Sequence, residues 1–316
     1  MRRILVASLA LAAVALPAAA QNPNCAGRPT FTQDACEKAT DLYNYMMPQL
    51  GTSLVGGSHT LGVGSTLGGF PHFAIALRGN AIRGDLPDLA TVNVGIGGRT
   101  RSNIGAKDQI LSLPGVDFAL GVYKGFPLGV TRVGGVDLIG SVTYIPDIDT
   151  DEVTIVTDGG SAKIGLGARV GLLEQSLVVP GVSFSYLVRD LPTLGMNAAA
   201  GNANFDITDF SVKTKSWRLA AQKSLMVFQL GVGVGQDTYE SGADISVTGV
   251  GAMTTTVAQE VTRTSMYGSL GFDIVLAKIV AEVGRVSGGE VSVYNNFSEA
   301  ADKSRLYGSV GIRISF

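Results

Sequence analysis

The last ten residues, YGSVGIRISF, place an apolar side chain at every second position. The alternating residues are Val310, Ile312, Ile314 and Phe316, with Ser309, Gly311, Arg313 and Ser315 between them. Because the side chains of a β-strand point alternately to opposite faces, this stretch predicts a strand with one apolar face and one small or polar face. The same alternation recurs in HFAIALRGN, VDFALGVY, VSFSYLVRD and MVFQLGVGVGQ. A period of two that recurs this often predicts an all-β fold.

Composition indicates where the apolar faces point. The chain is 46% hydrophobic and only 16% charged, and its mean hydropathy is +0.29. A soluble exported sandwich usually covers its outside with more Lys, Glu and Asp than this. After the N-terminal stretch, no apolar run approaches the roughly 18 residues of a membrane helix. Hydrophobicity is therefore high but dispersed over strands, and the net charge of -2 argues against a nucleic-acid partner.

Residues 1–20 have the layout of a secretory signal peptide. Arg2 and Arg3 precede an apolar run that ends near Leu16, and small residues lead to Ala20. We expect cleavage after Ala20 and export of the mature chain, with an uncleaved membrane anchor as the alternative.

The connections between the predicted strands alternate between short and long along the chain. Bacterial outer-membrane barrels have this asymmetry, with short periplasmic turns, long external loops and strands that alternate apolar outside and polar inside. In hydrocarbon every backbone N–H and C=O needs an internal partner, so an open sheet cannot span the membrane. The sequence predicts a transmembrane antiparallel up-and-down β-barrel in the bacterial outer membrane, surrounded by outer-membrane lipid and lipopolysaccharide.

The barrel is expected to occupy residues 67–316. The strands predicted by alternation are 70–82, 114–124, 134–145, 161–173, 180–190, 205–221, 224–237, 260–274, 277–288 and 304–316. Residues 90–97 are a further candidate strand or the arm of an external hairpin. Because bacterial barrels favour even strand numbers, we expect about 10–12 strands, with fourteen as a further alternative.

The N-terminal segment, residues 21–66, has a different pattern. From Thr30 onward, apolar residues such as Ala39, Leu42 and Met46 recur at helical spacing, and Pro48 is expected to end the helix. This predicts one short amphipathic helix. Two placements stay open, a plug inside the lumen and a periplasmic cap.

The chain has two cysteines, Cys25 and Cys36. Export to an oxidising compartment favours a disulfide between them, and closing so short a loop is worth about 3 kcal/mol in the chain-entropy model. Two unpaired thiols are the alternative. No His or further Cys stands at metal-ligand spacing, so we expect no metal site here.

The polar face of the predicted strands carries charges of both signs. The lumen-lining candidates are Arg78, Asp117, Asp137, Lys163, Arg169, Arg189, Arg218, Asp273, Glu282 and Arg313. Buried charges must be paired or hydrated. They form either a polar lumen that selects solutes or a salt-bridge network that packs a narrow barrel shut.

An enzymatic function is not expected. General-base chemistry usually uses a histidine, and the chain has only His59 and His72. Strings such as GLGARVG alternate inside strands and lack the helix that a dinucleotide fingerprint requires. We predict no catalytic residues, no cofactor and no metal.

Two resemblances to known families add expectations. The ending at Val310, Ile312, Ile314 and Phe316 resembles the C-terminal signature of outer-membrane barrel proteins, which implies recognition by the barrel-assembly machinery and its periplasmic chaperones. The order of helix and then glycine-rich barrel resembles, in architecture only, the long-chain fatty-acid transporter family. The N-terminal motif of that family is missing here, so its substrate class is not carried over.

These features predict a channel or transporter for a small solute, with a hydrophobic solute as one option. The alternative is a non-transporting structural or surface-binding barrel whose long loops are the functional part.

Overall fold

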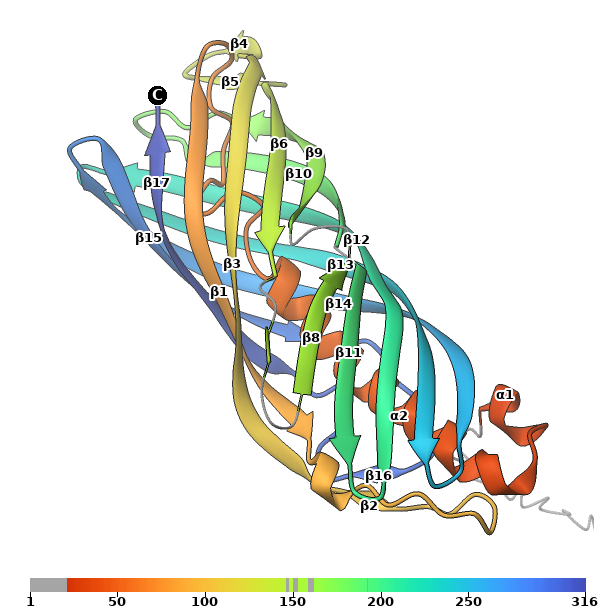
Figure 1. The fold of residues 1–316 in the computed structure, drawn as a ribbon. Helices are drawn as coiled ribbons and strands as arrows, with labels where there is room; N and C mark the ends of the chain where they lie inside the picture. Colours follow the sequence, from red (N-terminus) through yellow and green to blue (C-terminus); the bar gives the residue numbers. More distant parts are fainter. Residues whose placement is uncertain (1–21, 146–147, 150–152, 159–161, 192) are drawn as a thin grey trace, which may run out of the picture.

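The computed structural model describes residues 22–145, 148–149, 153–158, 162–191 and 193–316. Ten long antiparallel strands form a closed ring in which each strand pairs with its neighbours along the chain (Figure 1). They are β1 (Phe73–Pro87), β3 (Ala106–Tyr123), β6 (Val136–Tyr144), β9 (Ala162–Leu173), β10 (Gly181–Asp190), β12 (Ala203–Leu225), β13 (Phe228–Gly249), β14 (Met253–Ile274), β15 (Ala277–Ser287) and β17 (Arg305–Ser315). The β10–β12 and β1–β17 pairings close the ring. The predicted up-and-down barrel is therefore confirmed, with ten strands in the ring.

Shorter elements extend this ring at its two ends. The added strands are β2 (Asn103–Ile104), β4 (Phe126–Leu128), β5 (Thr131–Val133), β7 (Ile148–Asp149), β8 (Val153–Asp158), β11 (Thr193–Ala200) and β16 (Asn296–Phe297). β11, β8 and β7 continue the sheet from the far end of β12, while β2 and β16 pair in parallel. The candidate strand at residues 90–97 was wrong, because a 3-10 helix (Leu89–Thr91) and an irregular segment stand there.

The outward face of the ring changes from apolar to polar along the long strands, as β13 shows. On β13 the outward residues Phe228, Leu230, Val232 and Val234 are apolar and exposed, and the next outward residue is Gln236. A closed ring with an exposed apolar belt is suited to lipid, and barrels of this class carry a belt about 25 Å tall. The chain is thus an outer-membrane β-barrel. The belt adjoins the tight turns at 226–227 and 275–276, which identifies that end as periplasmic.

We call the belted part of the ring, which on β13 is Phe228–Gly235, the membrane half. The part beyond it, which on β13 is Gln236–Gly249, is the external half. The predicted strand ends at residue 237, and residues 238–259, up to the next predicted strand, were expected to be a long connection. In the structure β13 and β14 continue as a hairpin with only 250–252 between them. That part of the prediction was wrong because the polarity of the two faces inverts beyond Gln236.

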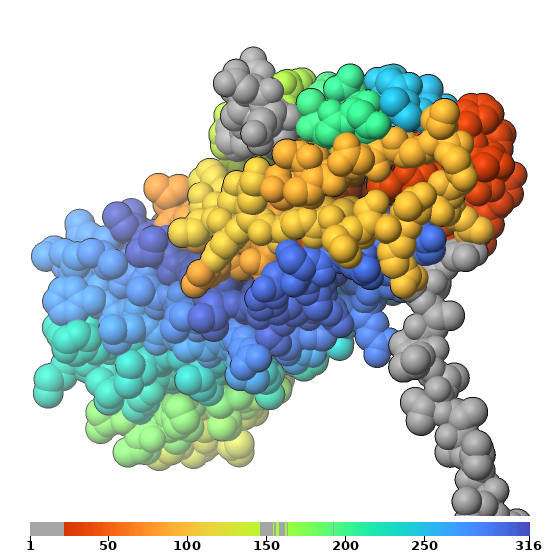
Figure 2. Space-filling view, turned by 90° about the horizontal axis from the view of Figure 1, so that it is seen from below, coloured from red at the N-terminus to blue at the C-terminus, as the bar shows by residue number. Residues whose placement is uncertain are grey.

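Two helices precede the barrel, α1 (Pro23–Ala26) and α2 (Thr30–Val55). No helix in the described part of the chain is long and apolar enough to cross a membrane. α2 lies inside the external half, with its start at the external end (Figure 1). In Figure 2 the red N-terminal helices lie at one edge of the molecule, between the yellow-orange β1–β3 connection and the cyan strand tips.

Pro48 does not end the helix, contrary to the prediction. A proline inside a helix cannot donate to the carbonyl four residues earlier, which here belongs to Asn44. Gln259 Nε2 on β14 donates to that oxygen instead, at 3.3 Å. Contact with the barrel wall therefore satisfies the carbonyl, and the helix continues for seven residues past Pro48, to Val55.

Candidate functional site

The interior of the external half is apolar. α2 packs against inward residues of β11, β12 and β13 in the largest hydrophobic cluster of the described chain, which includes Met47, Phe205 and Ile245. Inside this cluster lies a cavity of about 90 Å³. Its lining comes from α2, β11–β13 and Leu89, and consists of aliphatic, methionine and aromatic side chains. Such a lining suits a small apolar molecule and offers a charged one no partner.

The polar side of α2 holds the external loops in place. Asp34 accepts hydrogen bonds from the backbone N–H of Gly95 at 2.7 Å and of Thr100 at 2.9 Å. Asp41 accepts from the N–H of Tyr294 at 3.0 Å and from both Asn295 nitrogens at 2.6 and 2.7 Å. Burial nevertheless raises the pKa of Asp41 above its ordinary value. The polar stripe expected of an amphipathic helix thus faces loops rather than water.

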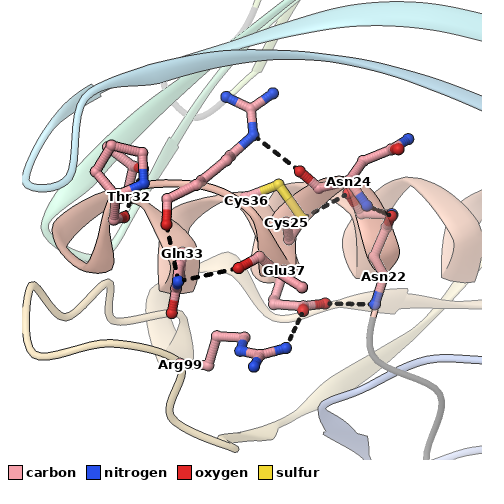
Figure 3. The surroundings of a disulfide bond; sticks show 12 residues. Asn22, Asn24, Cys25, Thr32, Gln33, Cys36, Glu37 and Arg99 are labelled. Atoms are coloured by element: carbon pink, nitrogen blue, oxygen red, sulfur yellow. Dashed lines mark hydrogen bonds and ion pairs between the residues drawn. A yellow bond between two sulfur atoms is a disulfide. The ribbon is translucent and has the colours of Figure 1, made fainter.

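The start of the N-terminal segment is tied together at the external end. Cys25 and Cys36, both buried, form a disulfide (Figure 3). Gln33 Nε2 donates to the carbonyls of Ala26 and Arg28, and Glu37 pairs with Arg99 at 3.5 Å. Burial raises the pKa of Glu37. These contacts fix α1 against the first turns of α2.

After α2 the chain runs through the lumen of the membrane half as an irregular segment, residues 56–69. Gly57 and Gly62 adopt positive φ angles of 88° and 65°, and a Cβ at Gly62 would lie 2.7 Å from Val280 Cγ1. Only glycine fits such a backbone at so close an approach. We call residues 56–69 the lumen segment.

Wall side chains satisfy the backbone of the lumen segment. Arg78 donates to the carbonyls of Gly56 and Ser58, Arg218 to Gly57 and Arg313 to Leu61. Wall carboxylates accept hydrogen bonds from backbone N–H groups of the segment. Glu282 accepts from Ser58, Asp117 from Leu61 and Asp137 from Leu67. A buried irregular backbone needs such partners, because a buried N–H or C=O group without a hydrogen bond is costly.

The structure places most of the predicted lumen candidates around this segment. Eight are inward and buried: Arg78, Asp117, Asp137, Arg169, Arg189, Arg218, Glu282 and Arg313. The side chain of Lys163 lies outside the described part of the molecule. Asp273 was a wrong candidate, because it lies at the exposed β14–β15 turn and pairs there with Lys278 at 3.0 Å. Alternation along β14 places Asp273 on the inward face, but the residue lies at the periplasmic rim of the barrel rather than inside the lumen.

Three ion pairs join neighbouring strands on the inner face of the wall, in the membrane half and at its border with the external half. Arg78 pairs with Asp117 at 3.0 Å, Arg169 with Asp137 at 3.2 Å, and Arg218 with Asp237 at 2.8 Å. Asp237 was missed because it stood at the last residue of a predicted strand. The alternation of the predicted strand 224–237 already places it on the inward face, with Gln229 and Gly231.

The two histidines occupy different places. His59 lies in the lumen segment, 2% exposed, with Nδ1 2.9 Å from Ser185 Oγ and Nε2 2.9 Å from Ser216 Oγ. His72 lies at the periplasmic end, where its Nδ1 is 2.8 Å from the Gly69 carbonyl oxygen. Among the described residues, no group of three His, Cys, Asp or Glu side chains is arranged to hold a metal. The predictions of no enzyme, cofactor or metal stay predictions.

The C-terminal strand completes the ring next to β1. Val310, Ile312, Ile314 and Phe316 are all exposed on its outward face, within the belt. Phe316 exchanges backbone hydrogen bonds with Phe73, and their ring centroids are 5.3 Å apart. The first and last strands therefore meet at the periplasmic rim.

No protein-family model and no curated protein matches the chain. Similar solved structures include Ail of Yersinia pestis, 13% identical over 78% of this chain and 98% of that chain, with a TM-score of 0.29. The toluene transporter TbuX of Ralstonia pickettii is 8% identical over 83% and 96%, with a TM-score of 0.32. The transport unit of the autotransporter AIDA-I of Escherichia coli is 9% identical over 92% and 99%, with a TM-score of 0.32. The fold assignment rests on the closed ring and its belt, and the resemblance to fatty-acid transporters stays a prediction.

Proposed function

We propose that the protein carries a small apolar solute across the outer membrane and binds it in the cavity between α2 and β11–β13. The observation that supports this is the lining of the cavity, where Leu42 and Met46 of α2 face Phe205 and Ile207 of β12. An apolar cavity of about 150 Å³ holds benzene, so about 90 Å³ suits a solute of a few heavy atoms. Flexible methionine side chains can adjust to a larger one.

Passage through the membrane half requires the lumen segment to move. Its carbonyls are held by Arg78, Arg218 and Arg313, so these three arginines act as the latch of a gate in this proposal. Once the segment leaves the wall, the inward charged residues line the path.

Binding is tested by titrating the purified barrel with benzene and following methionine methyl resonances by NMR. Wild type should show saturable shifts at the cavity methionines. Ala198→Phe, which fills the cavity, should abolish them, while Ala281→Phe on the lipid-facing side of β15 should not. Identical titrations of wild type and Ala198→Phe would refute the site.

Passage is tested by planar-bilayer conductance. The intact chain should show rare openings, and a variant with Arg78→Gln and Arg313→Gln should open at least tenfold more often because the latch is weakened. Lys215→Gln, at an exposed pair outside the lumen, is the control. A variant as silent as wild type would speak against the gate.

The second candidate function is a non-transporting structural or surface-binding barrel. The many hydrogen bonds between the lumen segment and the barrel wall favour this alternative, because all of them would have to break before the segment could leave the lumen. Absence of both benzene binding and channel events would select this alternative.

Partners follow from the same architecture in this proposal. Outer-membrane lipid and lipopolysaccharide surround the belt. The barrel-assembly machinery and periplasmic chaperones are proposed to recognise the terminal strand, with Phe316 at its end. Phe316→Ser should lower the amount of folded barrel in the membrane, whereas Phe228→Ser at another belt position should not.

A further inference from the structure

Two buried arginines of the membrane-half lumen, Arg189 and Arg313, have no described carboxylate within ion-pair distance, and Arg189 is the one that borders a cavity. Arg189 on β10 is 4% exposed, and its Nε donates to Ser141 Oγ at 2.7 Å. Its Nη1 is buried and has no hydrogen-bond partner in the structure. No described carboxylate lies within ion-pair distance of Arg189, in contrast to Arg78, Arg169 and Arg218. A buried guanidinium without a counter-charge is costly.

Arg189 borders a small cavity between the end of α2 and strands β1, β3, β6 and β10. The cavity has a volume of about 10 Å³, and its polar lining includes Asn80, Ser141 and Thr143. A volume of this size holds about one water-sized particle. Since Ser141 Oγ accepts from Arg189, its own O–H remains free to donate.

The other charges at the cavity are already matched. Asp117 lines it too, but its carboxylate is held by Arg78 at 3.0 Å and by the Leu61 N–H at 3.1 Å. The two remaining nitrogens of Arg78 donate to Gly56, Asn80 and Ser309. Among the charged groups that line this cavity, Arg189 is therefore the one without an ion pair.

We propose that this cavity binds one small inorganic anion of the size of chloride, held by Arg189 with the hydroxyls of Ser141 and Thr143. A water molecule would satisfy the Nη1 donor but would leave the positive charge of Arg189 unmatched. An anion both accepts the hydrogen bond from Nη1 and compensates the charge. Phosphate and sulfate are too large for a volume of about 10 Å³. Leu54 and Val55 also line the cavity, so the anion sits where α2 becomes the lumen segment. The site is separate from the apolar cavity and does not depend on transport.

The test is thermal unfolding of the full-length barrel in detergent at constant ionic strength. Replacing gluconate by chloride or bromide should raise the Tm of wild type by roughly 2–4 °C, because a ligand that binds only the folded state stabilises it. Arg189→Gln should abolish the response. Arg285→Gln, at an exposed outward arginine of β15, should keep it. A chloride response that survives in Arg189→Gln, or none in wild type, would overturn the proposal.

A crystal soaked in bromide gives an independent readout that does not depend on whether Arg189→Gln folds. An anomalous peak within hydrogen-bond distance of Arg189 is expected, and Thr143→Val should reduce its occupancy. A site that refines as water at saturating bromide would show that the cavity holds solvent only.

Discussion

The membrane half and the external half of the ring are built from the same strands with opposite polarity. On β13 the membrane half has Phe228 and Val232 outside and Gln229 inside, while the external half has Ile245 and Val247 inside. The outward residues of the external half, such as Glu240, are polar. The strand period of two is kept throughout, and only the assignment of faces changes.

The surroundings explain this inversion. Lipid bathes the belt, so the apolar face of the membrane half lies outside, and the irregular lumen segment inside needs charged and polar partners. Beyond the belt the ring stands in water, so its apolar face turns inward onto α2, as in a soluble protein. The segment that fills the lumen differs in the same way: the irregular, glycine-rich lumen segment lies in the membrane half, and α2 lies in the external half.

The largest expected effect is in the polar filling of the membrane half. Arg218→Met leaves Asp237 buried and unpaired, so we expect a loss of about 3–5 kcal/mol in the free energy of unfolding. Urea unfolding of the barrel in lipid vesicles measures it. The control, Lys215→Met on the same strand, breaks an exposed pair with Glu240 and should cost under about 1 kcal/mol. Equal losses would contradict the comparison.

The next effect tests the apolar filling of the external half. Ile245→Ala opens a cavity in the core around α2 and should lower the free energy of unfolding by about 2–4 kcal/mol. Ile279→Ala, in the belt on β15, should cost less, because lipid takes up the space of the removed atoms. If the belt substitution proves as costly, the two halves do not differ in packing as described.

Sequence alternation predicted the ring well because the belt fixes one face of every strand. It failed beyond Gln236 because the method follows a single apolar face, and a strand that exchanges its faces then resembles a polar loop. Asp237 was lost at this point, and with it one partner of the central ion pairs. Asp273 shows the opposite error, because alternation gives the face of a residue but not its depth along the barrel.

The apolar cavity could not be predicted from the sequence. Its walls come from α2, from β11–β13 and from Leu89, and which face of the helix meets which strand is decided only when the chain folds. The apolar spacing that predicted a helix did identify Ala39, Leu42 and Met46, which line the cavity. What was missing was the continuation of α2 past Pro48, which depends on a hydrogen bond from a strand distant in the sequence.

A smaller effect tests that hydrogen bond. Gln259→Ala leaves the Asn44 carbonyl without its donor, so we expect a loss of about 1 kcal/mol in the free energy of unfolding. Hydrogen exchange should show faster exchange in α2 after Pro48 than before it. Thr264→Ala, an outward-facing change on the same strand, is the control. Unchanged exchange in the second part of α2 would mean that the helix continues for another reason.

The smallest effect is a pH dependence confined to the external half. Burial raises the pKa of Asp41 and Glu37 above their ordinary values of 3.8 and 4.5. Between the unfolded and the folded pKa the native state binds more protons, so the free energy of unfolding falls as the pH rises through that window. Their contribution to stability is thus fully present below the unfolded pKa and is lost above the folded one.

Urea unfolding between the ordinary carboxyl pKa and neutral pH measures this slope. Asp41→Asn combined with Glu37→Gln should flatten it, because neither amide titrates, while Asp190→Asn at an exposed ion pair corrects for the loss of a surface carboxylate. Asp41 binds the loop before β17 and Glu37 pairs with Arg99 in the β1–β3 loop, so loop protection in hydrogen exchange should follow the same curve. If hydrogen-exchange protection in the membrane half followed the same pH curve as these loops, the membrane half and the external half would unfold as one unit. The two halves would then differ in polarity but not in stability.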